Sequence, residues 1–223
     1  MFTFDGRDIE FISTLDASLA RHLPENICVL LSGAPDCSVV TVGLEGGFVC
    51  LNVSHPGVDY MRRQLFFSSN GEIDLHNQRI RLHTTARGQG FLARSVSRQL
   101  EGIETLSVQG NMTVSSFSTV VVAPAYANQN DSRAEPDIGY WLLPQLGFDS
   151  PCIIPGTLTE RFPRASPKSL VRLLQERDIQ DWWFDAGRSA SFSLKFSLEP
   201  GSLSRQVLRD YTTRQSNTNG TAL

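Results

Sequence analysis

The sequence predicts an α+β fold, because stretches with helical periodicity and stretches of strand type both occur along the chain. Between residues 8 and 22, Ile and Leu recur at three- and four-residue steps, which predicts a helix with one apolar face. The apolar runs 39–44 and 48–53 flank Glu45-Gly46-Gly47, which predicts a β-hairpin. Residues 191–198 alternate Phe and Leu with Ser and Lys, as in a half-buried strand.

The remaining elements are predicted from the same two periodicities and from the positions of Gly and Pro. Further strands are expected at 27–31, 72–75, 79–84, 103–109 and 114–122, and further helices at 90–100, with Gly102 at its C-cap, at 138–146 and at 202–211. Another helix begins at Ser166-Pro167-Lys168, where Ser can cap the helix and Pro fits its first turn. Residues 72–84 are expected to form a hairpin around 76–78, 60–67 fits either type, and 125–137 is a polar loop.

Composition narrows the function classes. The chain has 223 residues, 40% of them hydrophobic, which is enough for one large domain or a domain with an appendage. Its net charge of −3 argues against a general nucleic-acid-binding protein, and no apolar run is long enough for a membrane span. The four cysteines form no CxxC pair and have no His at zinc-like spacing, so we expect free thiols, no metal and a cytoplasmic location.

A loop that could hold a diphosphate is the first candidate site. Arg87-Gly88-Gln89-Gly90-Phe91-Leu92 follows a predicted strand and opens a predicted helix. A helix start offers unpaired N–H groups and the positive end of the helix dipole, and glycines allow the backbone to approach a ligand closely. The dinucleotide fingerprint fits poorly, because no suitable acidic residue follows, and the Walker A pattern is absent.

Two segments together resemble the acyl-CoA site of the GNAT acyltransferases. The GNAT loop reads Gln/Arg-x-x-Gly-x-Gly/Ala; Arg87 and Gly90 match it, and Leu92 stands at the last small position. A late GNAT helix reads Tyr-x-x-x-Gly-Phe, and here Leu143 stands in place of the tyrosine, ahead of Gly147-Phe148. Residues 139–149 and the later Trp182-Trp183 resemble more closely a bacterial GNAT-like group that carries a C-terminal extension.

The resemblance implies a fold, a substrate and site residues. The expected fold is a mixed, mostly antiparallel central sheet flanked by helices over residues 1–155, with a small α/β extension over 156–223. The expected substrate is acetyl-CoA or another acyl-CoA, with its diphosphate bound by Arg87, Gly88, Gln89, Gly90, Phe91 and Leu92. Tyr140, one turn before Leu143, is the candidate acid for the departing thiolate. The acceptor is an unknown amine of a small molecule or a protein, and the resemblance leaves room for a homodimer.

Two alternatives remain beside acyl transfer. The departures at Leu92 and Leu143, with the aromatic segment 182–184, motivate a GNAT-like domain without activity that acts in protein interaction or assembly. An unrelated α+β binding domain is the other alternative. For acyl transfer itself, the 79–84 strand is expected to supply oxyanion donors. Residues that could assist the acceptor are then Glu72 and Asp74 as bases and Asn111 as a contact.

Overall fold

A computed structural model gives the fold, and it describes residues 2–83, 89–109, 112–121, 139–150, 169–186 and 192–220. The chain forms two compact units. The first consists of Met1–Phe117 together with Thr212–Leu223, and the second of Ser118–Tyr211. The predicted domain boundary at residue 155 lies outside the described residues.

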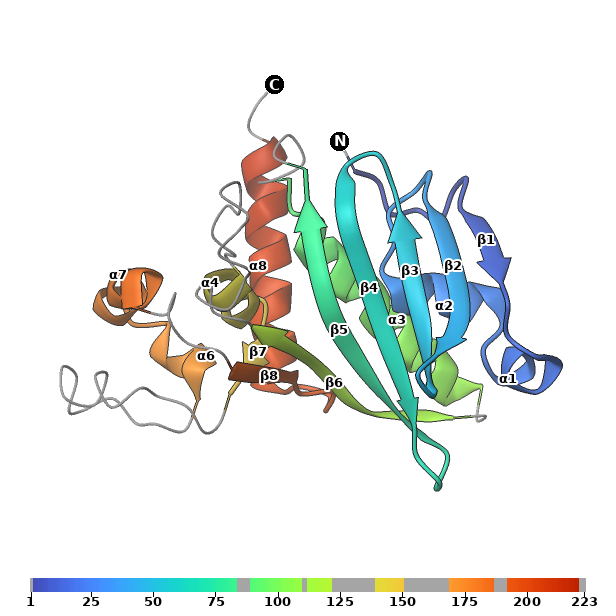
Figure 1. Cartoon of the computed structure of the whole chain (residues 1–223). Coiled ribbons are helices and arrows are strands. Elements are labelled where there is room, and N and C mark those ends of the chain that lie inside the picture. Colours follow the sequence, from blue (N-terminus) through green and yellow to red (C-terminus); the bar gives the residue numbers. More distant parts are fainter. Residues whose placement is uncertain are drawn as a thin grey trace, which may run out of the picture. The chain divides into compact units, whose positions relative to one another are not determined.

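The first unit contains an open, mixed sheet. Its strands are β1 (Glu10–Ser13), β2 (Val39–Glu45), β3 (Phe48–Ser54), β4 (Val58–Phe67), β5 (Glu72–Leu82) and the first half of β6 (Thr113–Val121). They lie in chain order, with β1 and β2 parallel and β2 to β5 successively antiparallel (Figure 1). This confirms the predicted α+β class and the mixed, mostly antiparallel sheet.

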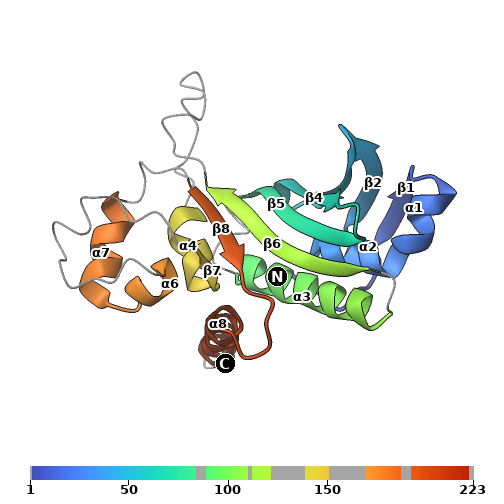
Figure 2. The ribbon, with the colours of Figure 1, turned by 90° about the horizontal axis from the view of Figure 1, so that it is seen from below.

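Helices cover one face of this sheet. They are α2 (Glu25–Ser32) and α3 (Phe91–Val108), whereas α1 (Ala17–His22), which follows β1, has no buried residue. Figure 2 shows α2 and α3 on the same side of the strands. The core between them and the sheet is apolar and fully buried, and includes Ile27, Leu31, Leu51, Leu65 and Val96. Burial of this face supplies most of the stability of the unit.

Strands β5 and β6 are parallel and α3 connects them. Ser115, the third residue of β6, donates a hydrogen bond from its Oγ to the carbonyl of Ile73, the second residue of β5 (3.4 Å). The two strands therefore begin at the same edge of the sheet and run in the same direction. A helical crossover is the usual connection between parallel neighbours, so β5, α3 and β6 form a βαβ unit. The first turn of α3 consequently starts near the carboxyl end of β5.

The predicted helix over residues 8–22 is wrong in its first half. Residues 10–13 form β1, which pairs with β2 from Glu10 opposite Val39 onward. Asp8 has a positive φ of 53°, which interrupts a helix there. The helix starts only after Asp16, whose side chain accepts the N–H groups of Ser18 and Leu19 as an N-cap. Long-range pairing with β2 and this cap together override the local periodicity.

Two predicted strands are helical. Residues 27–31 lie in α2, between Pro24 at its N-cap and Gly33 in the left-handed conformation at its C-cap. Residues 103–108 belong to α3, with Gln109 as its C-cap, so the helix does not end at Gly102. A Cβ on Gly102 would lie 2.9 Å from Leu30 Cβ and 3.0 Å from the Leu31 nitrogen. This glycine permits close approach of α2 and α3 rather than ending a helix.

The predicted hairpin over residues 72–84 is also wrong. Residues 72–82 form the single strand β5, and the turn at Ser68–Gly71 joins it to β4. The pairing shifts where Arg62 faces Arg79 and Arg63 faces Asn77, so Gln78 is an extra residue in a β-bulge. This irregularity resembles a turn in the sequence, although the strand continues through it.

The second unit begins within β6 and contains α4 (Gly139–Gln145), β7 (Phe148–Asp149), α6 (Leu170–Leu173), α7 (Arg177–Ala186), β8 (Phe192–Phe196) and the first half of α8 (Leu203–Gly220). Strands β7 and β8 are antiparallel and place Phe148 edge-to-face against Phe196. The predicted helix 138–146 and strand 191–198 are confirmed, while α8 extends beyond the predicted 202–211. The predicted cap at 166–168 lies outside the described residues, and Ser169 caps α6.

A guanidinium is buried without a counter-charge under the sheet of the first unit. Arg63 on β4 is fully buried, and burial lowers its pKa to about 9, which leaves it cationic at neutral pH. Nη1 donates to the carbonyl of Arg62 at 3.2 Å and Nη2 to Ser95 Oγ at 3.4 Å, whereas Nε has no hydrogen-bond partner. None of the ion pairs between described residues includes Arg63. Such a group costs free energy of folding.

We therefore predict that Arg63→Met stabilises the protein. The expected gain in the free energy of unfolding is about 1–4 kcal/mol, because the cost of desolvating the cation disappears while most of the buried volume is kept. Urea unfolding followed by circular dichroism measures it. The matched control is Arg62→Met at the neighbouring position, whose exposed ion pair with Glu45 is worth about 1 kcal/mol or less. Destabilisation by Arg63→Met would contradict the prediction.

A second prediction concerns Gly147, which follows α4 with a φ of 93°. A Cβ there would clash with the backbone of Ser204 in α8, coming within 2.8 Å of its Cα. Gly147→Ala should lower the free energy of unfolding by about 3 kcal/mol, since strain and overlap add. Gly201→Ala is the control, because Gly201 also has a positive φ, of 74°, but open space around it, so that only the strain remains. Equal melting temperatures for the two variants would refute the close contact.

Candidate functional site

The predicted diphosphate loop is described from Gln89 onward. Arg87 and Gly88 lie outside the described residues, whereas Gln89, Gly90, Phe91 and Leu92 lie within them. Gly90 is the N-cap of α3, with a φ of 68°, and no side chain caps the helix there. The helix thus begins at the predicted position and with the predicted glycine.

The first turn of α3 offers free backbone donors. The N–H of Arg94 makes the first bond within the helix, to the carbonyl of Gly90 at 3.2 Å. In the described part of the chain, no group accepts a hydrogen bond from the N–H of Phe91, Leu92 or Ala93. The first turn also carries no acidic residue. Unpaired N–H groups and the helix dipole together favour an anion at this end.

Arg94 adds a cation beside this turn. Its Nη2 donates to the carbonyl of Gln89 and its Nη1 to the carbonyl of Phe2, both at 2.8 Å. Its guanidinium also lies 5.8 Å from the centre of the Phe4 ring. The N-terminal segment therefore holds Arg94 against the bend around Gly90. Arg94 is not among the site residues predicted from the sequence, although a cation near a helix start is unusual, since the helix dipole disfavours it there.

Phe91 and Leu92 differ in their surroundings. Phe91 is buried and packs edge-to-face on Phe2 (4.7 Å between ring centres) and on Phe4 (5.5 Å). Its side chain therefore anchors the start of α3 to the N-terminal segment. Leu92 is half-buried. Any contribution of Phe91 to a ligand would come from its backbone N–H.

A titratable pair lies at the carboxyl end of β5. His83 Nε2 is 3.0 Å from Asp59 Oδ1, and Arg81 Nε is 3.6 Å from the other oxygen of Asp59. Asp59 projects from a second irregularity in the β4–β5 pairing, between Val58 and Tyr60. No sequence pattern predicts this pair, because its members are 24 positions apart in the chain.

The bases considered from the sequence lie elsewhere. Glu72 and Asp74 are at the start of β5, roughly 26–33 Å along the strand from Leu82 at its end. They are therefore at the opposite end of the strand from the first turn of α3. Asp74 instead accepts a hydrogen bond from Ser115 at 3.1 Å. Asn111 lies outside the described residues.

The second predicted segment forms α4 and β7. Pro144 lies inside α4, and Leu146, Gly147 and Phe148 are buried, with Gly147 leading into the strand. Leu143, at the position of the family tyrosine, is buried and has no proton to donate. The backbone of Tyr140 lies in α4, but its side chain is outside the described residues, so its role stays a prediction.

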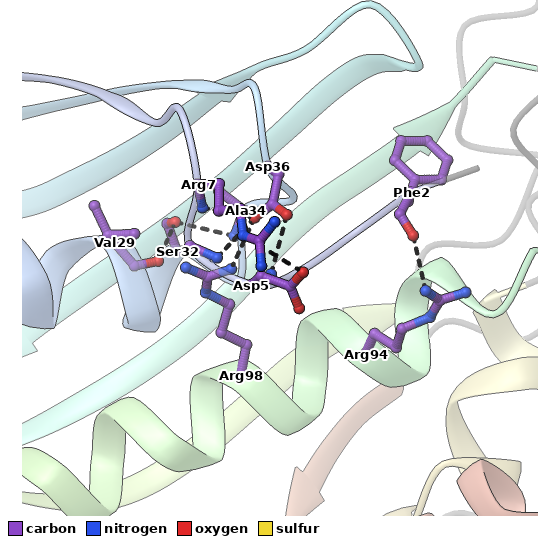
Figure 3. A network of polar contacts seen from close by, with 10 residues as sticks. Phe2, Asp5, Arg7, Val29, Ser32, Ala34, Asp36, Arg94 and Arg98 are labelled. Carbon is purple, nitrogen blue, oxygen red and sulfur yellow. Dashed lines mark hydrogen bonds and ion pairs between the residues drawn. The ribbon is translucent and has the colours of Figure 1, made fainter. Parts of the chain in front are cut away.

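A buried ion pair fixes the N-terminal segment to α3 (Figure 3). The carboxylate of Asp36 accepts the N–H groups of Asp5 (3.1 Å), Gly6 (2.7 Å) and Arg7 (3.1 Å), and one of its oxygens lies 3.8 Å from Arg98 Nη1. Burial alone would raise the pKa of Asp36. The hydrogen bonds that it accepts, from the Thr3 side chain first, outweigh this effect and hold the pKa below its usual value.

Other site classes find no support in the described residues. These contain no group of three or more His, Cys, Asp or Glu side chains that could hold a metal. None of the described helices combines the length and the hydropathy that crossing a bilayer requires. Cys28 and Cys50 are buried free thiols, whereas Cys37 is exposed.

Comparisons with protein-family models, with curated proteins and with solved structures found no match to this chain.

The Asp36 network generates a prediction about pH. Asp36→Asn should lower the free energy of unfolding by about 3 kcal/mol at pH 7, because it leaves Arg98 buried without its carboxylate. Since the folded-state pKa of Asp36 is depressed, its contribution is complete above the unfolded-state value of about 3.9 and is lost as the pH falls through the folded-state pKa. The difference between wild type and variant should therefore shrink towards pH 3.

Urea unfolding at several pH values between 7 and 3 measures the difference in the free energy of unfolding between wild type and Asp36→Asn. Asp5→Asn is the matched control, because it removes an exposed carboxylate from the same segment and should change stability by about 0.5 kcal/mol or less. A loss for Asp36→Asn that stays constant over the whole pH range would contradict the electrostatic explanation.

Proposed function

We propose that this protein is an acyl-CoA-dependent N-acyltransferase of the GNAT type, which transfers an acetyl or related acyl group to an amine. The observation that carries the proposal is the bend at Gly90. Three N–H groups of α3 without described acceptors, together with Arg94, form an anion-binding arrangement at the carboxyl end of β5. Ligands of sheets with helical crossovers commonly bind at this end of the strands.

The order of elements supports the same proposal. The resemblance requires a strand that enters the loop, a helix, a further strand, and then a helix that ends in Gly-Phe before another strand. The chain has β5, α3, β6, α4 and β7 in this order. The further strand is β6, and not the segment 103–109 predicted for it.

The bend suits a diphosphate better than a neutral ligand. Each diphosphate oxygen can accept an N–H of the first turn, and the missing Cβ of Gly90 leaves the backbone accessible. Arg94 would contribute its charge next to these donors while both of its described hydrogen bonds go to neutral carbonyl oxygens. The loop departs from the family pattern two positions after Gly90, where Leu92 stands in place of a Gly or Ala.

In the proposed reaction, a neutral amine attacks the thioester carbonyl, a C–N bond forms and the C–S bond breaks. A base accepts the amine proton, and an acid protonates the departing thiolate. The His83–Asp59 pair supplies a titratable group one residue after the end of β5, in place of Glu72 and Asp74. The β-bulge at Gln78 interrupts the β4–β5 pairing just before residues 79–84, from which the oxyanion donors are expected.

A GNAT-like domain without transfer activity is the second candidate. The buried Leu143 favours it, because an apolar residue stands where the family acid would be. The aromatic segment supports it less than its sequence suggests, since Trp183 is buried within the second unit and covers its core. Under this alternative, acetyl-CoA binds but no amine is acylated.

The proposal predicts that acetyl-CoA raises the melting temperature of the protein. Gly90→Glu should remove the effect, because a carboxylate at the bend blocks the approach of the diphosphate and repels it. Gly47→Glu is the matched control: Gly47 also has a positive φ, of 87°, with open space around it, in the β2–β3 turn. It should carry similar strain and keep the full response to acetyl-CoA.

Differential scanning fluorimetry with acetyl-CoA and longer acyl-CoAs makes the measurement. If no acyl-CoA shifts the wild-type transition at about millimolar concentration, the proposal fails. An unchanged response in Gly90→Glu would place any binding outside the bend. Release of free thiol in the presence of an amine then separates the active enzyme from the binding-only alternative.

A further inference from the structure

The face of the first sheet that turns away from α2 and α3 carries an exposed aromatic pair (Figure 2). On β3, β4 and β5, the fully buried side chains of Val49, Leu65 and Ile73 point towards the helices. Because side chains alternate along a strand, the neighbouring Phe48 and Phe66 project from the opposite face. Their ring centres are 5.1 Å apart, and 40% of Phe66 is exposed. Aromatic side chains are enriched where protein surfaces meet, so this pair marks a candidate interaction surface.

A carboxylate stands at each end of the aromatic pair. Glu45 lies opposite Phe48 in the β2–β3 pairing, and Asp74 lies opposite Phe66 in the β4–β5 pairing. The four side chains therefore form one row across four neighbouring strands. Glu72, two residues before Asp74 on β5, is exposed on the same face. We call Phe48, Phe66, Glu72 and Asp74 the aromatic–acidic patch.

The two ends of the row differ in their charge balance. The chain's own Arg62 neutralises Glu45, with 2.7 Å between Arg62 Nη2 and Glu45 Oε2. At the other end, Asp74 accepts a hydrogen bond from the neutral Ser115 Oγ at 3.1 Å. None of the ion pairs between described residues includes Asp74 or Glu72. The Asp74 end therefore lacks the cation that the Glu45 end already has.

A guanidinium or an ammonium group is the chemistry that completes the patch. A cation over the face of Phe66 is attracted by the ring, and the carboxylates of Asp74 and Glu72 balance its charge at the same time. A guanidinium suits both contacts, since it is planar, stacks on aromatic rings and pairs with a carboxylate through two parallel hydrogen bonds. The charges of the patch therefore fit an arginine of a partner, or with weaker contacts a lysine.

The spacing of the patch favours an extended polypeptide as the carrier of this cation. Neighbouring strands are about 4.8 Å apart, so the midpoint between the two rings lies about 7 Å from Asp74. Side chains i and i+2 of an extended chain are also about 7 Å apart. An apolar residue on the rings would thus place a basic residue, two positions further on, at Asp74. The outer face of a sheet does not enclose a small molecule in the way that a concave ligand site does.

A second copy of this chain suits the patch less well. In a two-fold dimer, the same surface of both copies meets. The two acidic patches would then face each other, and like charges across an interface repel.

We propose that the aromatic–acidic patch binds an extended basic segment of another protein, with an apolar residue followed two positions later by Arg or Lys. The patch is at the start of β5, whereas the bend at Gly90 follows the other end of this strand. The inference therefore does not rest on acyl transfer. A protein that fails to bind acetyl-CoA can still bind the basic segment, and the reverse also holds.

Amide NMR titrations of the full chain with capped pentapeptides test the proposal. The probes are acetyl-Gly-Leu-Thr-Arg-Gly-amide and the same peptide with Gln or Glu in place of Arg. We expect the Arg peptide to shift the amide signals of Phe48, Phe66 and Asp74, and to bind about fivefold more tightly than the Gln peptide. The Glu peptide should bind more weakly than both, because its charge is repelled.

Two variants with the same change in net charge locate the contact. Asp74→Asn should remove most of the preference for the Arg peptide over the Gln peptide. Glu45→Gln, in the same row, is the matched control and should keep this preference, because Arg62 already balances that carboxylate. Phe66→Leu keeps an apolar side chain without a ring, so it should weaken the Arg peptide about two- to threefold and leave the Gln peptide nearly unchanged.

Three results would overturn the proposal. One is the absence of shifts at the patch with the Arg peptide up to about 10 mM, a concentration that reveals even weak binding. Another is an equal loss of preference in Asp74→Asn and Glu45→Gln, which would indicate attraction by net charge alone. The third is a change of the patch signals with protein concentration in the absence of peptide, which would assign the patch to a second copy of the chain.

Discussion

The close contact between α2 and α3 is the constraint on which the first unit depends. Two glycines, one from each helix, remove the side chains that would hold the helices apart. A Cβ on Gly33 would clash with Ser95, reaching within 2.7 Å of its carbonyl oxygen, and a Cβ on Gly102 would meet Leu30 and Leu31. Between these two contact points, Gln99 reaches the carbonyl of Leu31 at 2.9 Å and the side chain of Asn77 on β5 at 2.8 Å. The same contact thus fixes α3 relative to both α2 and the strand that enters the bend.

Local chemistry explains which parts of this fold could be predicted from the sequence. The β2–β3 hairpin depends on Gly46 and Gly47, whose positive φ values belong to the turn itself. The start of α3 was predicted for a similar reason, at Gly90. In contrast, residues 27–31 and 103–109 are short apolar runs that fit a strand as well as a buried helix. Only the packing of α2 against α3, which a single sequence does not reveal, decides between the two.

The residues of the candidate site also fall into those that the sequence predicts and those that only the tertiary fold brings together. Glycine and the helix start are local features, and they identified the bend. Arg94 depends on the carbonyl of Phe2, 92 positions away, and His83 depends on Asp59 across two strands. Asp36 and Arg98 are likewise brought together only by the tertiary fold. Side chains whose partners are distant in sequence carry no pattern that a periodicity or a motif could show, even though Arg94 brings a charge to the bend.

The two cations of α3 have different surroundings, and this difference gives them different roles. Arg94 and Arg98 are four residues apart on one helical face, where like charges repel. A carboxylate balances Arg98, whereas Arg94 has, within the described residues, hydrogen bonds to neutral carbonyls and a contact with an aromatic ring. The positive potential of the first turn is therefore left for a ligand of high negative charge, such as a diphosphate. At Arg98 the charge is already balanced by Asp36 and the side chain is buried, so Arg98 serves to hold the N-terminal segment on α3.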